Sequence, residues 1–307
     1  MIAPDPFFTY QTMISFLIPT YDYTCYKLVY DIHEQAEQLG IAYEIIVAED
    51  GSRSQVNIIA NHKITELTHC RHIVNRTNKG RAATCNQLAR EAQYDWIVFI
   101  DSDAGVDHPD FVRTYYNSIG KADVIVGGLH HAEHNYDPNV TLRFKYEKEA
   151  DKCRGSEMRN RNPYDKFSTF NVMIRRSVFL CILFDKDCHE YGYEDALFGV
   201  ELKRRQISIL HIDNPLVHLG LDTNEQFLRK SETALRTLSG IADRMEAHSY
   251  VGRAYQKCRQ LHLLWAVRLG FFLFCGAIRR NLLSQNPLLL LFSVYKLGYY
   301  ERVKRGV

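Results

Sequence analysis

The sequence predicts an α/β protein built on a mixed, mostly parallel sheet, followed by a helical extension at the C-terminal end. Three features support this fold class. Short apolar runs alternate with amphipathic stretches from residue 14 to residue 212, an order typical of βαβ units. Residues 96–100 are all apolar and β-branched or aromatic, and they run into Asp101-Ser102-Asp103, as expected of a buried central strand. From residue 224 onward the pattern becomes helical.

Composition favours a chain with a packed core. Hydrophobic residues make up 46% of the 307 residues and charged residues 24%. The net charge of +2 gives no overall case for nucleic acid as a partner. The eight cysteines show no CxxC pair, and residues 1–10 lack the basic and apolar regions of a secretory signal. We therefore expect a reducing, cytosolic setting.

The first half of the chain gives clear strand and helix signals. Pro19-Thr20 ends the first apolar run, and Gly40 is placed to cap the first amphipathic stretch. The second strand ends in Glu49-Asp50-Gly51-Ser52. The expected strands are residues 14–18, 44–48, 72–74 and 96–100, and the expected helices are residues 23–39 and about 78–93.

The second half is less regular. Residues 130–166 are polar, rich in Arg, Lys and Asn, and without a clean period. We expect them to form a long mobile segment over one face, since loops of that length are usually functional. The other expected elements are strands at residues 123–126, 170–174 and 207–212 and a helix over residues 192–205.

The C-terminal part divides the chain into a domain of residues 1–223 and an extension of residues 224–307. Residues 224–259 read as one continuous amphipathic helix, and residues 261–278 and 287–300 are strongly apolar. Both apolar runs fall short of the roughly 20 residues that a bilayer span needs. We expect two helices in the interface of an anionic membrane, with four aromatic residues at headgroup depth; the alternative is a hairpin packed on the main domain or on a homodimer partner. The aromatic residues are Trp265, Tyr295, Tyr299 and Tyr300.

A metal site is expected at the end of the central strand. Ligands of open α/β sheets bind beyond the carboxyl ends of the strands. Asp101 and Asp103 lie there, and two carboxylates so close together raise each other's pKa or recruit a cation. Oxygen ligands suit Mg²⁺ or Mn²⁺, and His218, after another apolar run, is a candidate to complete the metal shell. We expect a metal-bound diphosphate here, with Ser102 beside it.

Other strand and helix ends carry suitable groups. Tyr21, next to Thr20, could stack on a base, and a carboxylate of Glu49 or Asp50 could accept from a base N–H or a ribose hydroxyl. Each of these groups also has a purely structural explanation. Residues 49–52 could form an ordinary turn, and residues 78–86 an ordinary capped helix start. Glu194 and Asp195 could simply cap their helix, and His218 could be a core or surface histidine. The remaining candidates open helices, where N–H groups or a guanidinium meet phosphate: Asn78, Gly80, Arg81, Glu194 and Asp195.

Taken in order, these motifs resemble a family 2 glycosyltransferase of the GT-A fold, of the bacterial surface-polysaccharide type. The resemblance covers about residues 13–222 and rests on the ordered series Pro-Thr-Tyr, Glu-Asp-Gly-Ser, Asn-x-Gly, Asp-Ser-Asp, Tyr-Glu-Asp and Pro-x-x-His. It implies an inverting transfer of a sugar from a nucleotide diphosphate, usually UDP, with Mn²⁺ or Mg²⁺. It also implies a role for each matching residue: Asp50 would contact the base, Asp101 the ribose, Asp103 with His218 the metal, Asp195 would be the general base, and Glu194 would hold the acceptor.

The chain departs from the family pattern at several points. Glu49 stands where Asp is more common, and Thr84-Cys85-Asn86 stands where Ala-Arg-Asn is frequent, so that Arg81 would have to supply the phosphate cation. Tyr191-Gly192-Tyr193 replaces a Trp-Gly-Gly before the acid pair, and no Gln-x-x-Arg-Trp follows it, which disfavours a processive synthase.

Other classes fit less well. A haloacid-dehalogenase-type phosphatase would need Thr or Val soon after the second Asp, and Asp103-Ala104-Gly105-Val106 fits that pattern poorly. A nucleotidyltransferase would need a basic Gly-rich loop after the first strand, and residues 20–23 are not such a loop. The remaining alternative is a non-catalytic membrane-bound scaffold with a degenerate transferase domain. We expect a glycosyltransferase on the cytoplasmic face of the cell membrane, acting on a glycan or lipid-linked glycan.

Overall fold

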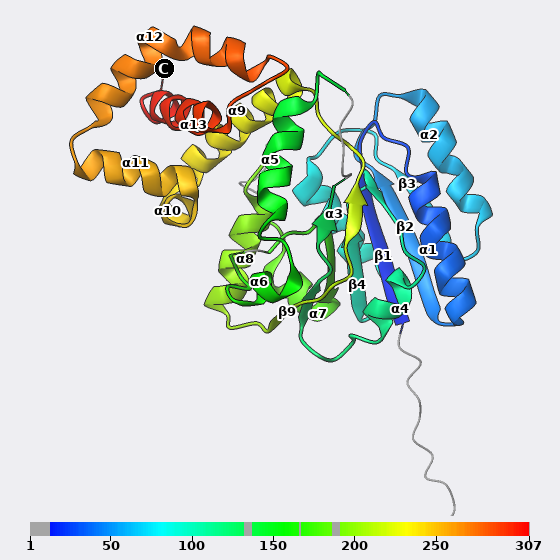
Figure 1. Ribbon diagram of the computed structural model, residues 1–307. Coiled ribbons are helices and arrows are strands. Elements are labelled where there is room, and N and C mark those ends of the chain that lie inside the picture. Colours follow the sequence, from blue (N-terminus) through cyan, green and yellow to red (C-terminus); the bar gives the residue numbers. More distant parts are fainter. Residues whose placement is uncertain (1–12, 132–136, 166, 186–190, 307) are drawn as a thin grey trace, which may run out of the picture.

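The structure is a computed structural model that describes residues 13–131, 137–165, 167–185 and 191–306. An α/β core carries a separate group of C-terminal helices on one side (Figure 1). Residues 1–10, in which no secretory signal was found, lie outside the described residues.

Among the described residues, one sheet has seven strands in the order β3-β2-β1-β4-β8-β6-β9. Strands β1, β2, β3 and β4 are parallel to one another, β8 is antiparallel to β4 and β6, and β6 is parallel to β9. The prediction of a mixed, mostly parallel sheet is therefore confirmed. The strands are β1 (Met13–Thr20), β2 (Ala42–Glu49), β3 (Cys70–Val74), β4 (Trp96–Ile100), β6 (Val124–Val126), β8 (Asn171–Arg175) and β9 (Ile209–His211).

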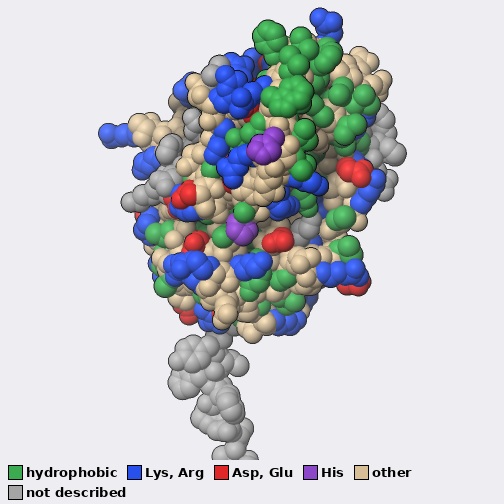
Figure 2. All heavy atoms as spheres, turned by 90° about the vertical axis from the view of Figure 1, so that its left-hand side faces the viewer, with side chains coloured by type: hydrophobic (Ala, Val, Ile, Leu, Met, Phe, Trp, Pro, Cys, Tyr) green, Lys and Arg blue, Asp and Glu red, His purple; other side chains and the backbone are tan. Residues whose placement is uncertain are grey.

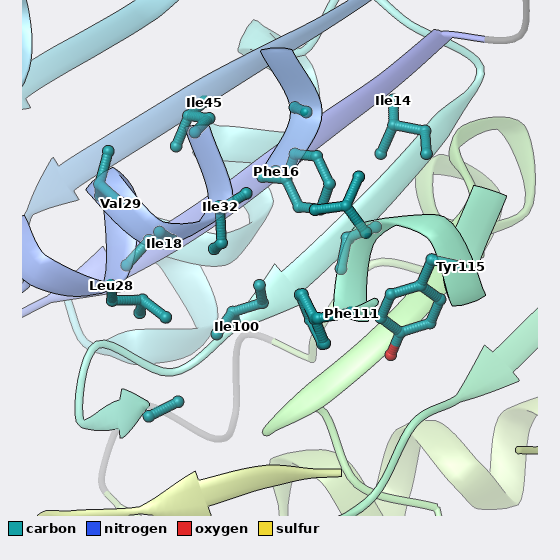
Figure 3. Packing of buried hydrophobic residues seen from close by; sticks show 14 of the residues in the cluster. Ile14, Phe16, Ile18, Leu28, Val29, Ile32, Ile45, Ile100, Phe111 and Tyr115 are labelled. Atoms are coloured by element: carbon teal, nitrogen blue, oxygen red, sulfur yellow. The ribbon is translucent and has the colours of Figure 1, made fainter. Parts of the chain in front are cut away.

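Helices cover both faces of this sheet. Alternate residues of a strand point to opposite faces, so Phe16 of β1 packs toward α1 and α4, whereas Leu17 packs toward the other face. Figure 3 shows the first core, in which Leu28 and Ile32 of α1 and Phe111 of α4 meet β1. The helices around the sheet are α1 (Tyr26–Leu39), α2 (Gln55–His62), α3 (Arg81–Glu91), α4 (Phe111–Tyr116), α7 (Arg176–Ile182) and α8 (Glu194–Arg204). The seven cysteines among the described residues are free thiols.

The expected mobile segment at residues 130–166 is largely helical where the structure describes it, so that prediction is wrong there. It forms α5 (Thr141–Asp151) and α6 (Ser156–Asn160). The hydrophobicity pattern does not reveal α5, because one of its buried residues is charged. Glu147 is 5% exposed and pairs with Arg143 at 2.7 Å and with Arg154.

A small second sheet lies beside the end of β4. It contains β5 (Ala104–Gly105), β10 (Leu216–His218) and β7 (Leu129–His130), with β10 in the middle. In the antiparallel β5–β10 pair, His218 lies opposite Ala104. This register brings the end of β10 to the Asp-Ser-Asp turn.

The predicted continuous helix over residues 224–259 is broken. It forms α9 (Asn224–Gly240), α10 (Ala242–Met245) and α11 (Tyr250–Gln260). Thr223 and Gln226 form a capping box at the start of α9, and the Ser249 hydroxyl caps α11 by accepting from the Gly252 N–H at 2.9 Å. A Cβ on Gly252 would lie 2.0 Å from the Glu246 carbonyl oxygen, so the chain can turn here only with glycine.

The two apolar C-terminal runs have different surroundings. They form α12 (Leu264–Leu282) and α13 (Leu289–Lys304), and α13 packs on α9, α11 and α12. Tyr295 and Tyr300 of α13 are buried, and their hydroxyls donate to Glu232 and Glu246, each at 2.6 Å. The prediction that these two tyrosines lie at headgroup depth is therefore wrong, since they belong to a packed helical core; α12 keeps an exposed apolar face.

None of the described helices alone is long and apolar enough to cross a bilayer. Helices α11 and α12 meet the length and composition criteria only as a pair, and that pair is bent by 119°.

Candidate active site

A cavity of about 790 Å³ lies where the chain leaves β1, β2 and β4. Its wall combines these strand ends with the start of α3, the start of α8 and the first half of α9. Ten of the predicted site residues line it: Thr20, Tyr21, Asp50, Asn78, Gly80, Arg81, Asp101, Ser102, Asp103 and Glu194.

The loops after β1 and β2 form one end of the cavity. The Tyr21 ring is 43% exposed, so a face is available for a planar group. Asp50 Oδ1 accepts from the Lys79 N–H at 2.7 Å, which ties the β2 end to the loop before α3. The two loops touch so closely that a Cβ on Gly51, whose φ is +67°, would lie 2.2 Å from the Asn78 nitrogen. Glycine at this position therefore lets Asp50 and Asn78 share one wall.

Glu49 does not line the cavity, so its predicted contact with the nucleotide is not supported. The side chain is fully buried beneath the sheet edge and accepts from Asn61 Nδ2 at 2.8 Å, from His72 Nε2 at 3.3 Å and from the Ser52 hydroxyl. Neighbouring residues at a strand end point in opposite directions, and here Asp50 points into the cavity while Glu49 points away from it. Glu49 is a structural residue.

We expect Glu49→Ala to lower the free energy of unfolding by about 3 kcal/mol, because it removes the buried acceptor of three hydrogen bonds, those from Asn61, His72 and Ser52. Burial raises the pKa of Glu49, but the hydrogen bonds from His72, Asn61 and Ser52 outweigh burial and hold it below its ordinary value of 4.5. The carboxylate therefore stabilises the fold above about that pH and loses this contribution as the pH falls. Denaturant unfolding at neutral and acid pH should show the difference from wild type shrinking in acid.

Asp50→Asn is the matched control for this prediction. The amide oxygen can still accept from the Lys79 N–H, so stability should change by less than about 1 kcal/mol. Equal stability losses in Glu49→Ala and Asp50→Asn would contradict the separation of roles.

Arg81 lies among three carboxylates instead of projecting freely toward phosphate. Its guanidinium donates to Asp101, with the Nε contact at 3.2 Å, and its Nη1 lies 3.4 Å from Asp195 Oδ1 and 3.8 Å from Glu194 Oε1. Nη2 donates to the Thr169 hydroxyl at 3.0 Å. The expectation that Arg81 supplies the phosphate cation is therefore not supported by this arrangement, since Arg81 neutralises the acids and links the end of β4 to the start of α8.

The acid pair at the start of α8 presents its two members differently. The Asp195 carboxylate accepts from Thr169 N–H at 3.0 Å and from the Thr169 hydroxyl at 2.5 Å; it is not among the residues that line the cavity, although its side chain is 29% exposed. Glu194 lines the wall and accepts from Gly192 N–H at 3.0 Å. Burial, followed by the charge of Asp195, raises the pKa of Glu194. Burial likewise raises the pKa of Asp101, although Arg81 opposes it.

Asp103 and His218 meet at the small sheet. His218 Nε2 lies 3.1 Å from Asp103 Oδ2. A Cβ on Gly220 would lie 2.4 Å from that carboxylate oxygen, so the approach requires glycine. Burial alone would raise the pKa of Asp103, but the hydrogen bond and charge of His218 outweigh it and lower the pKa.

His131 orients His218 and was missed by sequence reasoning. His131 Nε2 lies 3.2 Å from His218 Nδ1, and His131 Nδ1 lies 3.2 Å from Asp151 Oδ1. When His218 donates its Nδ1 proton to His131 Nε2, its own Nε2 lone pair is free for a metal, since the hydrogen bond of one ring nitrogen sets the state of the other. No local motif marks His131, which directly follows β7; the pairing of β7 with β10 brings it beside His218.

The donor pair suits a divalent cation. Adjacent ligands of an octahedral ion with bonds of about 2.1 Å are about 3.0 Å apart, close to the 3.1 Å between Asp103 Oδ2 and His218 Nε2. In the part of the chain that the structure describes, no three His, Cys, Asp or Glu side chains are grouped as a complete metal site. Asp101, predicted as a further ligand, is held by Arg81 and does not join the pair.

Helix α9 supplies one wall of the cavity, although the domain predicted to carry the site ends at residue 223. Gln226 and Lys230 line the cavity beside Asp222 and Tyr191. Lys230 Nζ lies 2.7 Å from Asp222 Oδ1 and 5.6 Å from the centre of the Tyr191 ring. A lysine on an amphipathic helix resembles an ordinary surface charge in sequence, so only the packing of α9 reveals it.

Fold and cavity together define an α/β protein of the GT-A type, and comparison with known proteins agrees. The sequence profile described as Glycosyl transferase family 2 matches residues 15–183. The chain belongs to this family, so it is a glycosyltransferase that uses a nucleotide-sugar donor. No curated protein matches the sequence.

Solved structures share the fold at low identity. S. aureus TarS (1–349) superposes with a TM-score of 0.51 at 15% identity over 96% of this chain and 91% of that chain. A mannosyltransferase, PcManGT from Pyrobaculum calidifontis, in complex with GDP-Man and Mn²⁺, gives 0.55 at 14% identity over 99% of this chain and 88% of that chain. TarS in complex with UDP-GlcNAc gives 0.50 at 16% identity over 96% and 91%. At these identities the likeness shows the fold alone.

Proposed function

We propose that the protein is a metal-dependent, inverting glycosyltransferase that moves a sugar from a nucleoside diphosphate, most simply UDP, to a hydroxyl of a glycan or lipid-linked glycan in surface-polysaccharide synthesis. The observation that carries this proposal is convergence. Separate chain segments bring Asp50, Asp101, Asp103 and Glu194 to one cavity. A turn, a capped helix or a stray histidine would each explain one motif, but none explains why all of them meet.

The charge of the cavity supports the metal dependence. Six carboxylates face two cations, Arg81 and Lys230, along its wall, and Arg81 is already shared among three acids. A diphosphate would add further negative charge, so its binding calls for another cation. Asp103 and His218 would hold Mn²⁺ or Mg²⁺, which as a Lewis acid offsets the charge that develops on the departing diphosphate. The GDP-Man and Mn²⁺ in the PcManGT complex and the UDP-GlcNAc in the TarS complex fit this chemistry.

The chain's own residues account for the other steps. Tyr21 and Asp50 would hold the base, and Asp101, kept in place by Arg81, the ribose. An acceptor hydroxyl attacks the anomeric carbon from the side opposite the diphosphate, the C–O bond to the diphosphate breaks, and its electron pair goes to the diphosphate oxygen. Asp195 would take the hydroxyl proton while Glu194 holds the acceptor. One displacement without an enzyme nucleophile inverts the anomeric centre.

We also propose that the enzyme attaches to the inner face of the cell membrane. Between Glu246 and Glu301 the chain has no Asp or Glu but has seven Lys or Arg residues. The outer face of α12 adds exposed apolar side chains. Apolar and basic groups together favour an anionic bilayer surface, where a lipid-linked acceptor would lie.

Thermal unfolding with UDP, GDP, dTDP and CDP, each with and without Mn²⁺, tests the donor site. A ligand that binds only the folded state raises the melting temperature as its concentration rises, so we expect a Mn²⁺-dependent rise with one nucleotide. Sugar conjugates of that nucleotide would then be incubated with the enzyme and glycan acceptors, and the anomeric configuration of the product would be determined by NMR. No rise with any nucleotide, or a product that retains the donor configuration, would overturn the proposal.

A further inference from the structure

A second cavity, of about 560 Å³, lies between α9, α12 and α13, apart from the active site. Its wall carries three guanidinium groups, those of Arg236, Arg279 and Arg302, but a single carboxylate, that of Glu232. Glu232 Oε1 is occupied, because it accepts from Tyr295 at 2.6 Å and from Arg279 at 3.2 Å. The Tyr299 hydroxyl accepts from Arg236 at 3.0 Å. Arg279 also pairs with Glu225 at 2.7 Å, outside the lining. The wall itself carries more guanidinium groups than carboxylates and offers donors of the kind that bind phosphate.

An exposed apolar stripe of α12 runs into this cavity. Trp265, Phe272 and Arg279 are seven residues apart and share one face of the helix, with Cys275, another wall residue, between the last two. Trp265 is 64% exposed and Phe272 is 84% exposed, although both are large apolar side chains. Figure 2 shows hydrophobic side chains gathered at the top of this face, where α12 lies, with Lys and Arg around them. A basic cavity and an apolar stripe thus adjoin on one helix.

This pairing fits one chemistry: a phosphate joined to an apolar chain. A soluble anion would need the guanidinium groups but not the aromatic stripe, and a protein partner would not require three arginines around one hollow. We propose that the cavity between α9, α12 and α13 holds the phosphate headgroup of a membrane lipid, while Trp265, Leu269, Phe272 and Leu273 enter the acyl region beside it. This inference rests on the proposed membrane attachment and specifies where and how the lipid is held.

The position of the cavity connects the lipid surface to catalysis. Helix α9 lines the active site with Gln226 and Lys230 and lines the second cavity with Glu232 and Arg236. The separation of ten residues between positions 226 and 236 corresponds to about 15 Å of helix. A lipid held at Arg236 would therefore place the membrane surface within reach of the site where the acceptor hydroxyl reacts.

Vesicle sedimentation tests the proposal. Full-length protein would be mixed with vesicles of phosphatidylcholine alone or of phosphatidylcholine with phosphatidic acid. We expect wild type to sediment with the phosphatidic acid vesicles and Arg236→Gln/Arg302→Gln to bind them about 30-fold more weakly, since each basic residue at a lipid surface contributes roughly fivefold. Trp265→Ser/Phe272→Ser should lose binding as well. Arg113→Gln/Arg161→Gln, two exposed arginines outside both cavities, is the matched control and should bind like wild type.

Several outcomes separate the possibilities. Binding of Arg236→Gln/Arg302→Gln at wild-type strength would overturn the headgroup site but leave membrane attachment standing. Wild-type protein could fail to bind either kind of vesicle and still be stabilised by nucleotide with Mn²⁺. That result would overturn both membrane attachment and the headgroup site, but it would leave the proposed glycosyl transfer standing. Stabilisation by soluble glycerol 3-phosphate without vesicle binding would assign the cavity to a free phosphate ester and so overturn the proposal that its ligand is a membrane lipid. A nucleotide-induced rise in melting temperature that each variant retains shows that it is folded.

Discussion

Asp103→Ala is expected to lower kcat at saturating donor by about 10³-fold and to remove the Mn²⁺-dependent part of nucleotide binding. Asp103 lines the cavity at the end of β4, 3.1 Å from His218 Nε2. Alanine deletes one of the two protein groups that suit the cation. Without the bound cation, the cavity lacks the positive charge that would offset the diphosphate. Steady-state transfer rates and nucleotide-induced thermal stabilisation, each across a range of Mn²⁺ concentrations, measure both effects.

Two further variants make this prediction specific. Asp107→Ala removes a carboxylate that pairs with His130 at the surface, at 2.7 Å and outside the cavity, and should turn over like wild type. His131→Ala keeps both candidate ligands but removes the support of His218, so it should weaken apparent Mn²⁺ affinity about 10- to 100-fold, with kcat restored by excess Mn²⁺. A merely structural role of His131 would not be rescued by metal. Unchanged Mn²⁺ dependence in Asp103→Ala would refute the metal assignment.

The parts of the fold that local pattern determines were predicted well. The central strand was placed at its observed bounds, Trp96–Ile100, because a wholly apolar β-branched run has few other uses. The order of strand-end motifs also placed ten of the site residues in one cavity, since the carboxyl ends of neighbouring parallel strands meet at one sheet edge.

The errors come from contacts between distant segments. Glu49 and Asp50 are adjacent acids, and only the packing of Asn61 and His72 beneath β2 decides which is buried. Arg81 was expected to contact phosphate, but the long reach of its guanidinium brings it to Asp195, which lies 114 residues further along the chain. Sequence spacing cannot reveal such a contact.

The C-terminal helices show the same limit for apolar residues. The runs that form α12 and α13 looked alike, and both were assigned to a membrane surface. Hydrophobicity predicts that a side chain is removed from water, but it does not predict which surface covers that side chain. Packing of α9, α11 and α12 around α13 buries Tyr300 completely, whereas Phe272 of α12 is 84% exposed. The two helices therefore differ in what they contact: α12 keeps a long exposed apolar face, whereas α13 exposes large apolar side chains mainly in its first half, at Leu290 and Val294.

Asp195→Asn is expected to lower kcat at least about 10²-fold while donor binding is retained. Asparagine can keep its oxygen on the Thr169 N–H and turn its amide N–H toward the Thr169 hydroxyl oxygen, so the start of α8 should keep its shape and the loss would report missing proton transfer. Transfer rates and nucleotide-induced stabilisation, measured side by side, separate the two. Glu194→Gln is the matched control: it also removes one carboxylate charge, one residue away, and should mainly raise the KM of the acceptor.

The pH dependence of kcat decides between the two acids, because Glu194 lines the cavity and has a raised pKa. Part of that rise comes from the charge of Asp195, and Asp195→Asn removes this charge, so the pKa of Glu194 should fall. If Glu194 were the base, Asp195→Asn would keep substantial activity and shift the acid limb of its pH profile to lower pH. If Asp195 is the base, the residual activity of Asp195→Asn should be low at every pH, while Glu194→Gln keeps most of its kcat.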